Sequence, residues 1–226
     1  MPALAVAEVV GPSGRVAATD PSPIFLAAIA ENVRAGGHGN VEIVQASATG
    51  LPFDPATFDA ATCHMGVMFF PDARAGLARI RELVKPSGRA AFVAWGPDAD
   101  NTFMRTGAGA SRPHLPPDPS ASGPPPNPAQ DAPRPTRYAE PGSLSAALAA
   151  AGFADVHEDA PMVDLVWPEG LATLTRFWLE LTRLEGRVAP ERHATLRADI
   201  AAAYERFRDG DTVRMPVRVV VASGAA

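Results

Sequence analysis

Apolar positions in the first hundred residues alternate between helical and strand spacing. Residues 23–35 carry one apolar face, made by Phe25, Leu26, Ile29 and Val33, and Ser22 stands where a helix N-cap belongs. A second amphipathic helix is expected over residues 73–83. Short apolar runs that fit strands occupy residues 15–19, 41–45, 58–63 and 90–95. Strands separated by helix-length crossovers predict an α/β fold, a Rossmann-like doubly wound and mostly parallel sheet covered on both faces.

The second half of the chain is richer in helix. We expect a helix over residues 143–151, a strand over 156–166, two longer helices and a last strand over 214–222. The two longer helices carry apolar stripes, which are Leu171, Leu174, Trp178 and Leu181 on the first and Leu196, Ile200, Tyr204 and Phe207 on the second. Phe177 and Trp178 either line a pocket for a flat apolar ligand or pack in the core, and the pattern leaves both open.

Proline divides the sequence. Of the 24 prolines, ten lie between Arg112 and Arg137, where large apolar side chains are scarce. Proline lacks a backbone donor, so such a stretch does not build helices or central strands. We predict a flexible insertion over residues 98–137 within one domain, which separates residues 1–97 from residues 138–226. A docking motif for a proline-binding partner is the alternative for this stretch.

Charge and composition exclude several classes of protein. The formal net charge is −5, which argues against a nucleic-acid binder. No run approaches the roughly 20 apolar residues of a membrane helix, and the N-terminus lacks a targeting pattern, so a cytoplasmic protein without a membrane span is expected. The single cysteine, Cys63, and the five histidines show no metal-ligand spacing, so no metal site is predicted.

Three expected strand ends carry groups that can bind a ligand. Asp20 and Pro21 follow the strand at 15–19, Ser47 and Ala48 follow the strand at 41–45, and Cys63 and His64 close the strand at 58–63. Ligands of doubly wound sheets bind outside the carboxyl ends of the strands. An acidic residue such as Asp20 can accept hydrogen bonds from both hydroxyls of a ribose, and a plain turn aspartate is the alternative.

The order of these segments resembles a known family. The runs GRVAATDPSP (14–23), VEIVQASATGLPFDPATFDAATCHMGVMFFPD (41–72), IRELVKPSGRAAFVAWGP (80–97) and FRDGDTVRMPVRVVVASG (207–224) are similar to class I S-adenosylmethionine-dependent methyltransferases, in the group that contains the ubiquinone and menaquinone biosynthesis enzymes. The resemblance implies that residues 1–97 form the cofactor-binding half of the domain and that the helices within 138–226 lie on the acceptor side.

The resemblance also implies roles for the residues at the strand ends. Asp20, followed by Pro21, would hold the ribose of S-adenosylmethionine, and Ser47 and Ala48 would lie against the adenine. Cys63 and His64 would face the methionine portion. The family usually has an acidic residue where Ser47 stands, and serine is a weaker partner for the adenine amino group. His64 is also the candidate general base, with a packing or turn histidine as the alternative.

A second departure from the family concerns the first strand. The family begins with a strand and a glycine-rich turn before the helix that corresponds to residues 3–10, and the present sequence shows neither. That strand is central in the family's sheet. Its absence predicts either a gap between the strands at 15–19 and 58–63 or their direct pairing. A displaced start or a truncated chain would explain the difference, and a real loss would weaken cofactor binding.

Three functions follow as alternatives. The first is an S-adenosylmethionine-dependent methyltransferase acting on a small molecule, which the missing turn would render inactive if the loss is real. The second is a non-catalytic remnant or interaction module. The third is an NAD(P)-dependent oxidoreductase, because an acid after the second strand occurs there too. The LPFD and KPSGR segments favour the methyltransferase.

Overall fold

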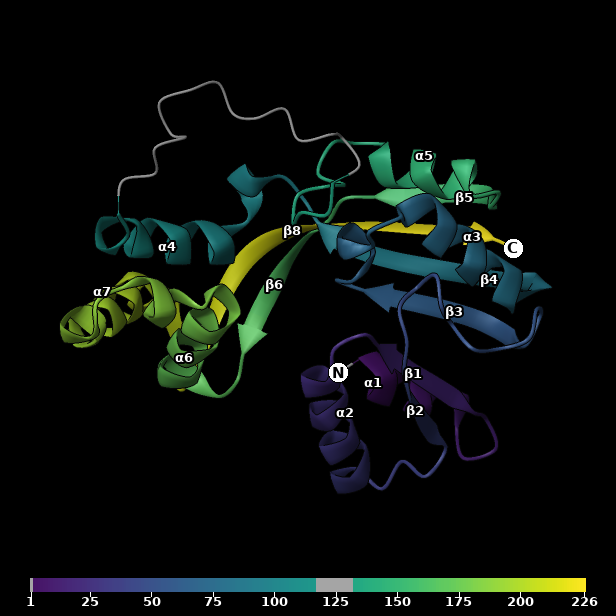
Figure 1. Ribbon diagram of the computed structural model, residues 1–226, viewed down its shortest axis with the longest axis horizontal. Helices are drawn as coiled ribbons and strands as arrows, with labels where there is room; N and C mark the ends of the chain where they lie inside the picture. Colours follow the sequence, from purple (N-terminus) through teal and green to yellow (C-terminus); the bar gives the residue numbers. More distant parts are fainter. Residues whose placement is uncertain (1, 117–131) are drawn as a thin grey trace. The chain divides into compact units, whose positions relative to one another are not determined.

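The computed structural model describes residues 2–116 and 132–226, and its elements are labelled in Figure 1. The α-helices are α1 (Pro2–Val10), α2 (Pro23–Ala35), α3 (Ala73–Leu83), α4 (Thr102–Ser111), α5 (Ser143–Ala150), α6 (Gly170–Thr182) and α7 (His193–Glu205). The strands are β1 (Val16–Asp20), β2 (Val41–Gln45), β3 (Phe58–His64), β4 (Val84–Trp95), β5 (Ala154–Asp159), β6 (Met162–Trp167), β7 (Arg208–Asp209) and β8 (Thr212–Ala225). The predicted α/β class is confirmed. None of the helices in the described part is long and apolar enough to cross a membrane.

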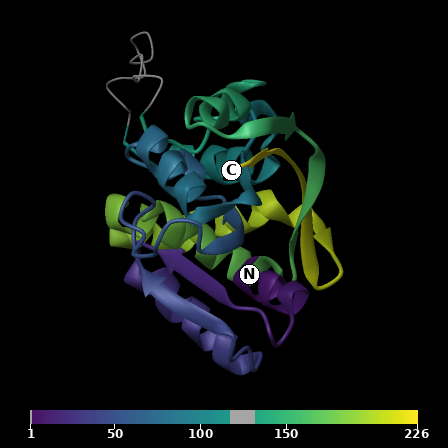
Figure 2. The same ribbon diagram turned by 90° about the vertical axis from the view of Figure 1, so that its right-hand side faces the viewer.

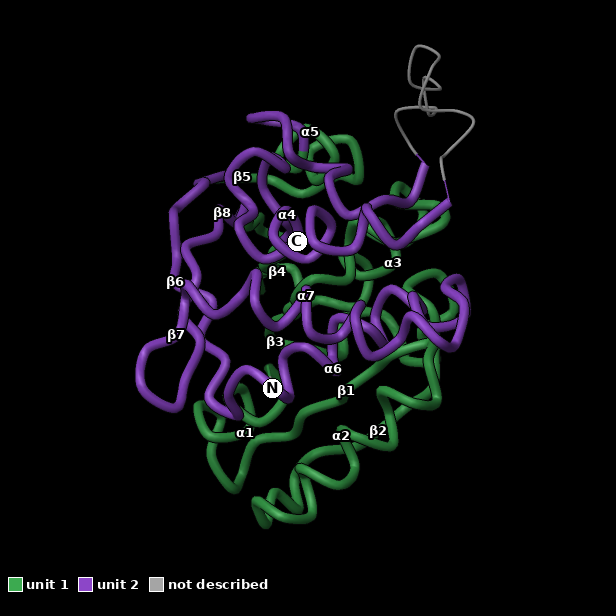
Figure 3. Tube along the Cα trace, turned by 90° about the vertical axis from the view of Figure 1, so that its left-hand side faces the viewer, with its two compact units in different colours: residues 1–93, 144–157, 222–226 green, residues 94–143, 158–221 purple. Residues whose placement is uncertain are grey.

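The chain folds as two compact units, coloured separately in Figure 3. Unit 1 contains residues 1–93, 144–157 and 222–226, and unit 2 contains residues 94–143 and 158–221. Strands β4, β5 and β8 each contribute residues to both units. All the residues predicted to bind a cofactor belong to unit 1.

The strands of unit 1 form two separate hydrogen-bonded sets. β1 and β2 pair in parallel, from Val16 opposite Val41 to Asp20 opposite Gln45, and α2 lies along this pair (Figures 1 and 2). β3 pairs in parallel with β4, in a sheet whose order is β3-β4-β8-β5. Within the described residues, β1 and β3 do not pair with each other. Of the two expected outcomes, direct pairing of these two strands is therefore excluded within the described residues.

The core of unit 1 lies between α3, α5 and the sheet. Leu77, Ile80 and Leu83 form the buried face of α3. The rings of Phe92 in β4 and Phe153 before β5 meet edge to face with their centroids 5.9 Å apart. Leu144 and Leu148 of α5 are fully buried. Burial of a large apolar side chain contributes about 1.5–3 kcal/mol, so this contact surface fixes α3 against the sheet.

The core of unit 2 is a set of helices around an aromatic cluster. Phe103 of α4, Trp178 of α6 and Tyr204 of α7 are all buried, and their rings lie 5.3–6.5 Å apart. The Tyr204 hydroxyl donates to the Phe103 backbone oxygen at 2.9 Å. Gly107 faces the Trp178 ring so closely that a side chain there would overlap it. A glycine at this position lets α4 approach the other two helices. On the other side of unit 2, β6 and β7 pair antiparallel with β8.

The structure differs from the sequence-based expectation at two strands. The strand expected over 156–166 is two strands, because Pro161 lacks the N–H that a continuous ladder needs. β4 begins at Val84 rather than at residue 90. The pairing shifts between Phe58 opposite Val84 and Ala60 opposite Arg89, so the KPSG segment bulges within an extended strand.

The segment 98–137, predicted as a flexible insertion, contains helix α4. The side-chain oxygen of Asn101 accepts from the Met104 N–H at 3.1 Å and caps the helix. Its sequence, TFMRTGAGAS, is dominated by small residues and has few large apolar side chains, which explains why the pattern did not reveal it. Residues 117–131 of the predicted insertion lie outside the described residues.

Candidate functional site

Asp20 ends β1, and the turn that follows orients its carboxylate. Oδ1 accepts a hydrogen bond from the Ser22 backbone N–H at 2.7 Å. The backbone oxygen of Asp20 accepts from the Ala46 N–H at 3.3 Å, and the Gln45 amide donates to the Pro21 oxygen at 3.2 Å. These bonds join the carboxyl ends of β1 and β2. Within the described part of the chain no residue bonds to Oδ2, so this oxygen can accept from a ligand.

The loop after β2 packs against α3. The Ser47 backbone oxygen accepts from the Gly50 N–H at 3.0 Å, and the Ser47 and Thr49 hydroxyls lie 3.3 Å apart. Ala48 lies over Gly76 of α3, where a Cβ atom would come within 3.0 Å of the Ala48 Cβ. Ser47 is exposed while Ala48 is half-buried. The loop therefore has an exposed hydroxyl, that of Ser47, next to a small apolar residue, Ala48, which packs on α3.

Arg79 holds the next part of this loop and was missed by the sequence analysis. Its Nη2 donates to the backbone oxygens of Leu51 and Phe53 at 3.0 and 2.5 Å, and its Nη1 donates to Glu82 at 2.6 Å. The Phe53 ring packs edge to face on Phe58, with centroids 5.0 Å apart. A guanidinium with several donors can satisfy two carbonyls at once, which lysine does less well. The only sign of this role in the sequence was the position of an arginine near the apolar side of the predicted helix.

Cys63 and the turn after it close β3. Burial raises the pKa of the Cys63 thiol to about 11, the backbone N–H groups of Gly66 and Val67 lower it in part, and the negative charge of Asp20 raises it further. The thiol is therefore protonated at neutral pH. Met65 has a left-handed backbone with φ of 56°, and its N–H donates to the Val93 oxygen at 2.9 Å. The chain then enters a short 3-10 helix, η1 (Val67–Phe69), of which Val67 and Met68 are buried.

His64 follows Cys63 at the end of β3. Desolvation by its surroundings lowers the pKa of the imidazole below its usual value, although the residue keeps substantial exposed area. A neutral imidazole at pH 7 can accept a proton. No hydrogen bond of the His64 ring to another described residue is found, so its orientation is not fixed by a partner.

The structure joins some of the predicted site residues by hydrogen bonds and brings others only near them. Asp20 and Pro21 are bonded to the end of β2, from which Ser47 and Ala48 follow directly. Cys63 lies within electrostatic range of Asp20, although their strands do not pair. Asp20, the Ser47–Ala48 loop and Cys63 thus lie at the carboxyl ends of three strands of unit 1, which is where ligands bind in parallel sheets.

Two of the other histidines, His114 and His193, have structural roles. His114 is buried and lies 2.8 Å from the Asp199 carboxylate, and His193 lies 2.9 Å from the backbone oxygens of Glu185 and Val188. Within residues 2–116 and 132–226 no group of three or more His, Cys, Asp or Glu side chains could hold a metal ion.

The two aromatic residues of α6, Phe177 and Trp178, differ in burial. Trp178 is buried, and its Nε1 donates to the Ser111 hydroxyl at 3.0 Å. It therefore belongs to the core of unit 2, which was the packing alternative. Phe177 is half-buried and meets Trp167 with ring centroids 4.8 Å apart.

The groups at the strand ends fit the nucleoside half of a nucleotide-like cofactor. A carboxylate with a free oxygen suits ribose hydroxyls, because an ionised carboxylate only accepts hydrogen bonds. A small half-buried residue beside an exposed hydroxyl suits the edge and face of a purine. All these groups belong to unit 1 and follow strands of parallel sets.

The comparisons with known proteins match the first part of the chain to methyltransferases. Residues 2–88 match a family model described as "Methyltransferase domain". The demethylmenaquinone methyltransferase of Bacillus subtilis (strain 168) is 35% identical over 86 residues, which are 38% of this chain and 37% of that protein. The matched part thus begins with α1 and ends within β4. Residues 2–88 are therefore similar to methyltransferase domains, and the chain spans well under half the length of the demethylmenaquinone methyltransferase that it matches.

Two further matches extend over most of the chain. The nocamycin O-methyltransferase of Saccharothrix syringae is 27% identical over 222 residues, which cover 96% of this chain and 79% of that protein. The crystal structure of the [4+2]-cyclase SpnF has a TM-score of 0.54 at 17% identity and covers 99% of this chain and 71% of that one. Because one of these related proteins is described as a cyclase, the fold alone does not settle the reaction.

Proposed function

We propose that this chain binds S-adenosylmethionine at the carboxyl ends of β1, β2 and β3 and methylates a small molecule. The observation that carries the proposal is the carboxylate of Asp20, which keeps one oxygen free while its other oxygen is held by the Ser22 N–H. The small-molecule acceptor is supported by the two relatives, whose names refer to demethylmenaquinone and nocamycin.

Each residue of the site has a definite part in this proposal. Asp20 accepts from the ribose hydroxyls, with the β1–β2 connection at Pro21 and Gln45 keeping the strand ends in place. Ala48 offers an apolar contact to the adenine, and Ser47 offers a hydroxyl. A neutral serine forms a weaker hydrogen bond than a carboxylate would, so we expect modest affinity at the adenine.

Cys63 and His64 would face the methionine portion. The thiol of Cys63 stays protonated at neutral pH, so it offers the methionine portion a small and uncharged contact. S-adenosylmethionine supplies the electrophilic methyl group when it is bound. His64 would take a proton from the acceptor if the acceptor must lose one, since its lowered pKa leaves the ring neutral at pH 7.

Calorimetric titration with S-adenosylhomocysteine tests the cofactor assignment. We expect binding by the wild-type chain and a loss of about tenfold or more in affinity for Asp20→Asn, because a hydrogen bond to a charged group is worth about 1.5–3 kcal/mol. Asp211→Asn is the matched control, because Asp211 is exposed in unit 2 and outside the proposed site. Equal affinity of Asp20→Asn and the control would refute the role of Asp20.

The same titration separates the three functions. Heat from S-adenosylhomocysteine but not from NADH supports the methyltransferase. Heat from NADH alone would support the oxidoreductase, for which the comparisons give no support. A folded chain that binds neither compound would support the non-catalytic alternative.

A further inference from the structure

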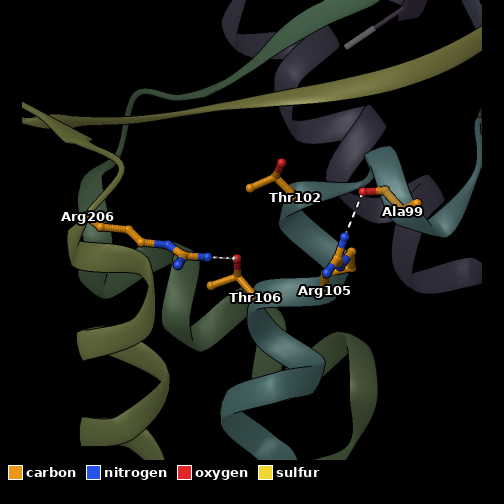
Figure 4. Close-up of a pocket in the computed structure, with 5 residues that line it drawn as sticks. All are labelled: Ala99, Thr102, Arg105, Thr106 and Arg206. Atoms are coloured by element: carbon orange, nitrogen blue, oxygen red, sulfur yellow. Dashed lines mark hydrogen bonds between the residues drawn. The ribbon is translucent and has the colours of Figure 1, made fainter.

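Unit 2 contains a pocket whose lining is mostly cationic and hydroxylic. It has a volume of about 290 Å³ and is lined by Ala99, Thr102, Arg105, Thr106 and Arg206, shown as sticks in Figure 4. Thr102, Arg105 and Thr106 come from the first half of α4, and Arg206 follows the last residue of α7. All five residues belong to the same unit. No residue of the pocket belongs to the proposed cofactor site.

Both arginines are oriented by neighbours that use only a small part of their hydrogen-bonding capacity. Arg206 donates from Nη2 to the Thr106 hydroxyl at 3.2 Å, and its guanidinium lies 4.6 Å from the centroid of the Phe207 ring. Arg105 donates from Nη1 to the Ala99 backbone oxygen at 2.9 Å. A guanidinium has five N–H donors, so most donors of both side chains remain available to a ligand.

Three carboxylates close to the pocket in sequence bind other arginines, and a fourth, Asp98, is exposed and is not among the residues that line the pocket. Asp100 pairs with Arg218 at 2.6 Å, Glu205 pairs with Arg208 at 3.1 Å, and Asp209 pairs with Arg214 at 3.6 Å. In the described part of the chain, neither Arg105 nor Arg206 forms an ion pair. The pocket lining therefore contains two positive charges and no negative one, in a protein whose formal net charge is −5.

We propose that this pocket binds the phosphate group of a small organic phosphate. A phosphate offers several acceptor oxygens in a tetrahedral arrangement, and two guanidinium groups with two threonine hydroxyls supply donors for them. The pocket is close to the lower end of the volume range of ligand sites, which leaves room for a compact group attached to the phosphate. The proposal does not depend on the methyl-transfer reaction.

The test compares phenyl phosphate with benzoate by calorimetry at constant ionic strength. We expect the wild-type chain to bind phenyl phosphate more tightly than benzoate. Arg105→Gln/Arg206→Gln should bind phenyl phosphate at least about tenfold more weakly, because two charge-assisted contacts are lost. Arg74→Gln/Arg187→Gln is the matched control, since it changes the net charge equally at two exposed arginines outside the pocket. The single variant Arg105→Gln keeps the Arg206–Thr106 contact and serves if the double variant fails to fold.

Each outcome bears on the proposal. Loss in the pocket variants with retention in the control supports it. Equal losses in both double variants would show a general charge effect and overturn it, as would a wild-type chain that binds neither probe. Tighter binding of benzoate would also overturn the phosphate assignment and identify a carboxylate site instead.

Discussion

Gly76 of α3 and Ala48 of the β2–β3 loop lie in direct contact. A Cβ atom at position 76 would lie 3.0 Å from the Ala48 Cβ and 2.9 Å from the Phe70 ring. Glycine lowers the stability of a helix interior, so its presence inside α3 is explained by this close approach. The contact fixes the loop that carries Ser47, and through it one side of the proposed cofactor site.

Substitution of Gly76 by alanine should therefore destabilise the protein and weaken cofactor binding. Overpacking typically costs about 1–3 kcal/mol, which exceeds the gain of roughly 1 kcal/mol in helix propensity. Urea unfolding and S-adenosylhomocysteine titration measure the two effects. Gly109→Ala is the control, because no atom lies within 4 Å of a Cβ built at this position of α4. It should stabilise the protein by up to about 1 kcal/mol. A neutral or stabilising Gly76→Ala would contradict the packing argument.

Arg79→Gln should release the loop at Leu51 and Phe53. Two backbone oxygens lose their donor, and a hydrogen bond to a charged group contributes about 1.5–3 kcal/mol, reduced here because the site is partly exposed. We expect a loss of about 1–2 kcal/mol in the free energy of unfolding, measured in urea. Arg74→Gln, on the exposed side of the same helix, should change it by less than about 0.5 kcal/mol. Similar values for both variants would show that Arg79 does not anchor the loop.

The thiol of Cys63 should affect stability only at alkaline pH. Its pKa is raised to about 11 in the folded chain, mainly by burial, so the folded state binds the proton more tightly than the unfolded state. Its contribution to stability is present below pH 9 and is lost as the pH rises from about 9 to 11. The difference in melting temperature between the wild-type chain and Cys63→Ser should change across this range, which isolates Cys63 from other alkaline groups. A constant difference would mean that the thiol titrates normally.

His64 should titrate below the normal range of histidine. Desolvation lowers its pKa, so the folded state binds the proton less tightly than the unfolded state. Its contribution to stability is present above the unfolded pKa of about 6.5 and declines as the pH falls below it. Proton NMR of the imidazole resonances, assigned with His64→Gln, measures the midpoint. A midpoint at or above the ordinary value would remove the basis for a neutral His64 at pH 7.

Much of the fold was predictable because local patterns agree with the tertiary structure. α3 was expected over residues 73–83 and occupies Ala73–Leu83, since its apolar spacing and its Asp72 cap point to the same boundaries. The break at Pro161 and the early start of β4 were not predicted. The early start of β4 depends on which residues of β3 and β4 pair, which a single strand's pattern does not reveal.

The candidate site was predictable only in part. Asp20, Ser47 and Cys63 were found because they follow strands, and strand ends define ligand sites in this fold. Arg79 and Gly76 were missed because their importance comes from contacts with residues about 26–28 positions earlier in the sequence. The pair Arg105 and Arg206 was missed for the same reason, because Arg206 meets α4 across 100 residues of sequence.

The most direct test of the account is a crystal structure of the chain with S-adenosylhomocysteine. We predict that the ribose hydroxyls bind the Asp20 carboxylate and that the adenine lies against Ala48, with the homocysteine part toward Cys63 and His64. A ligand bound elsewhere, or one that contacts none of these residues, would contradict it.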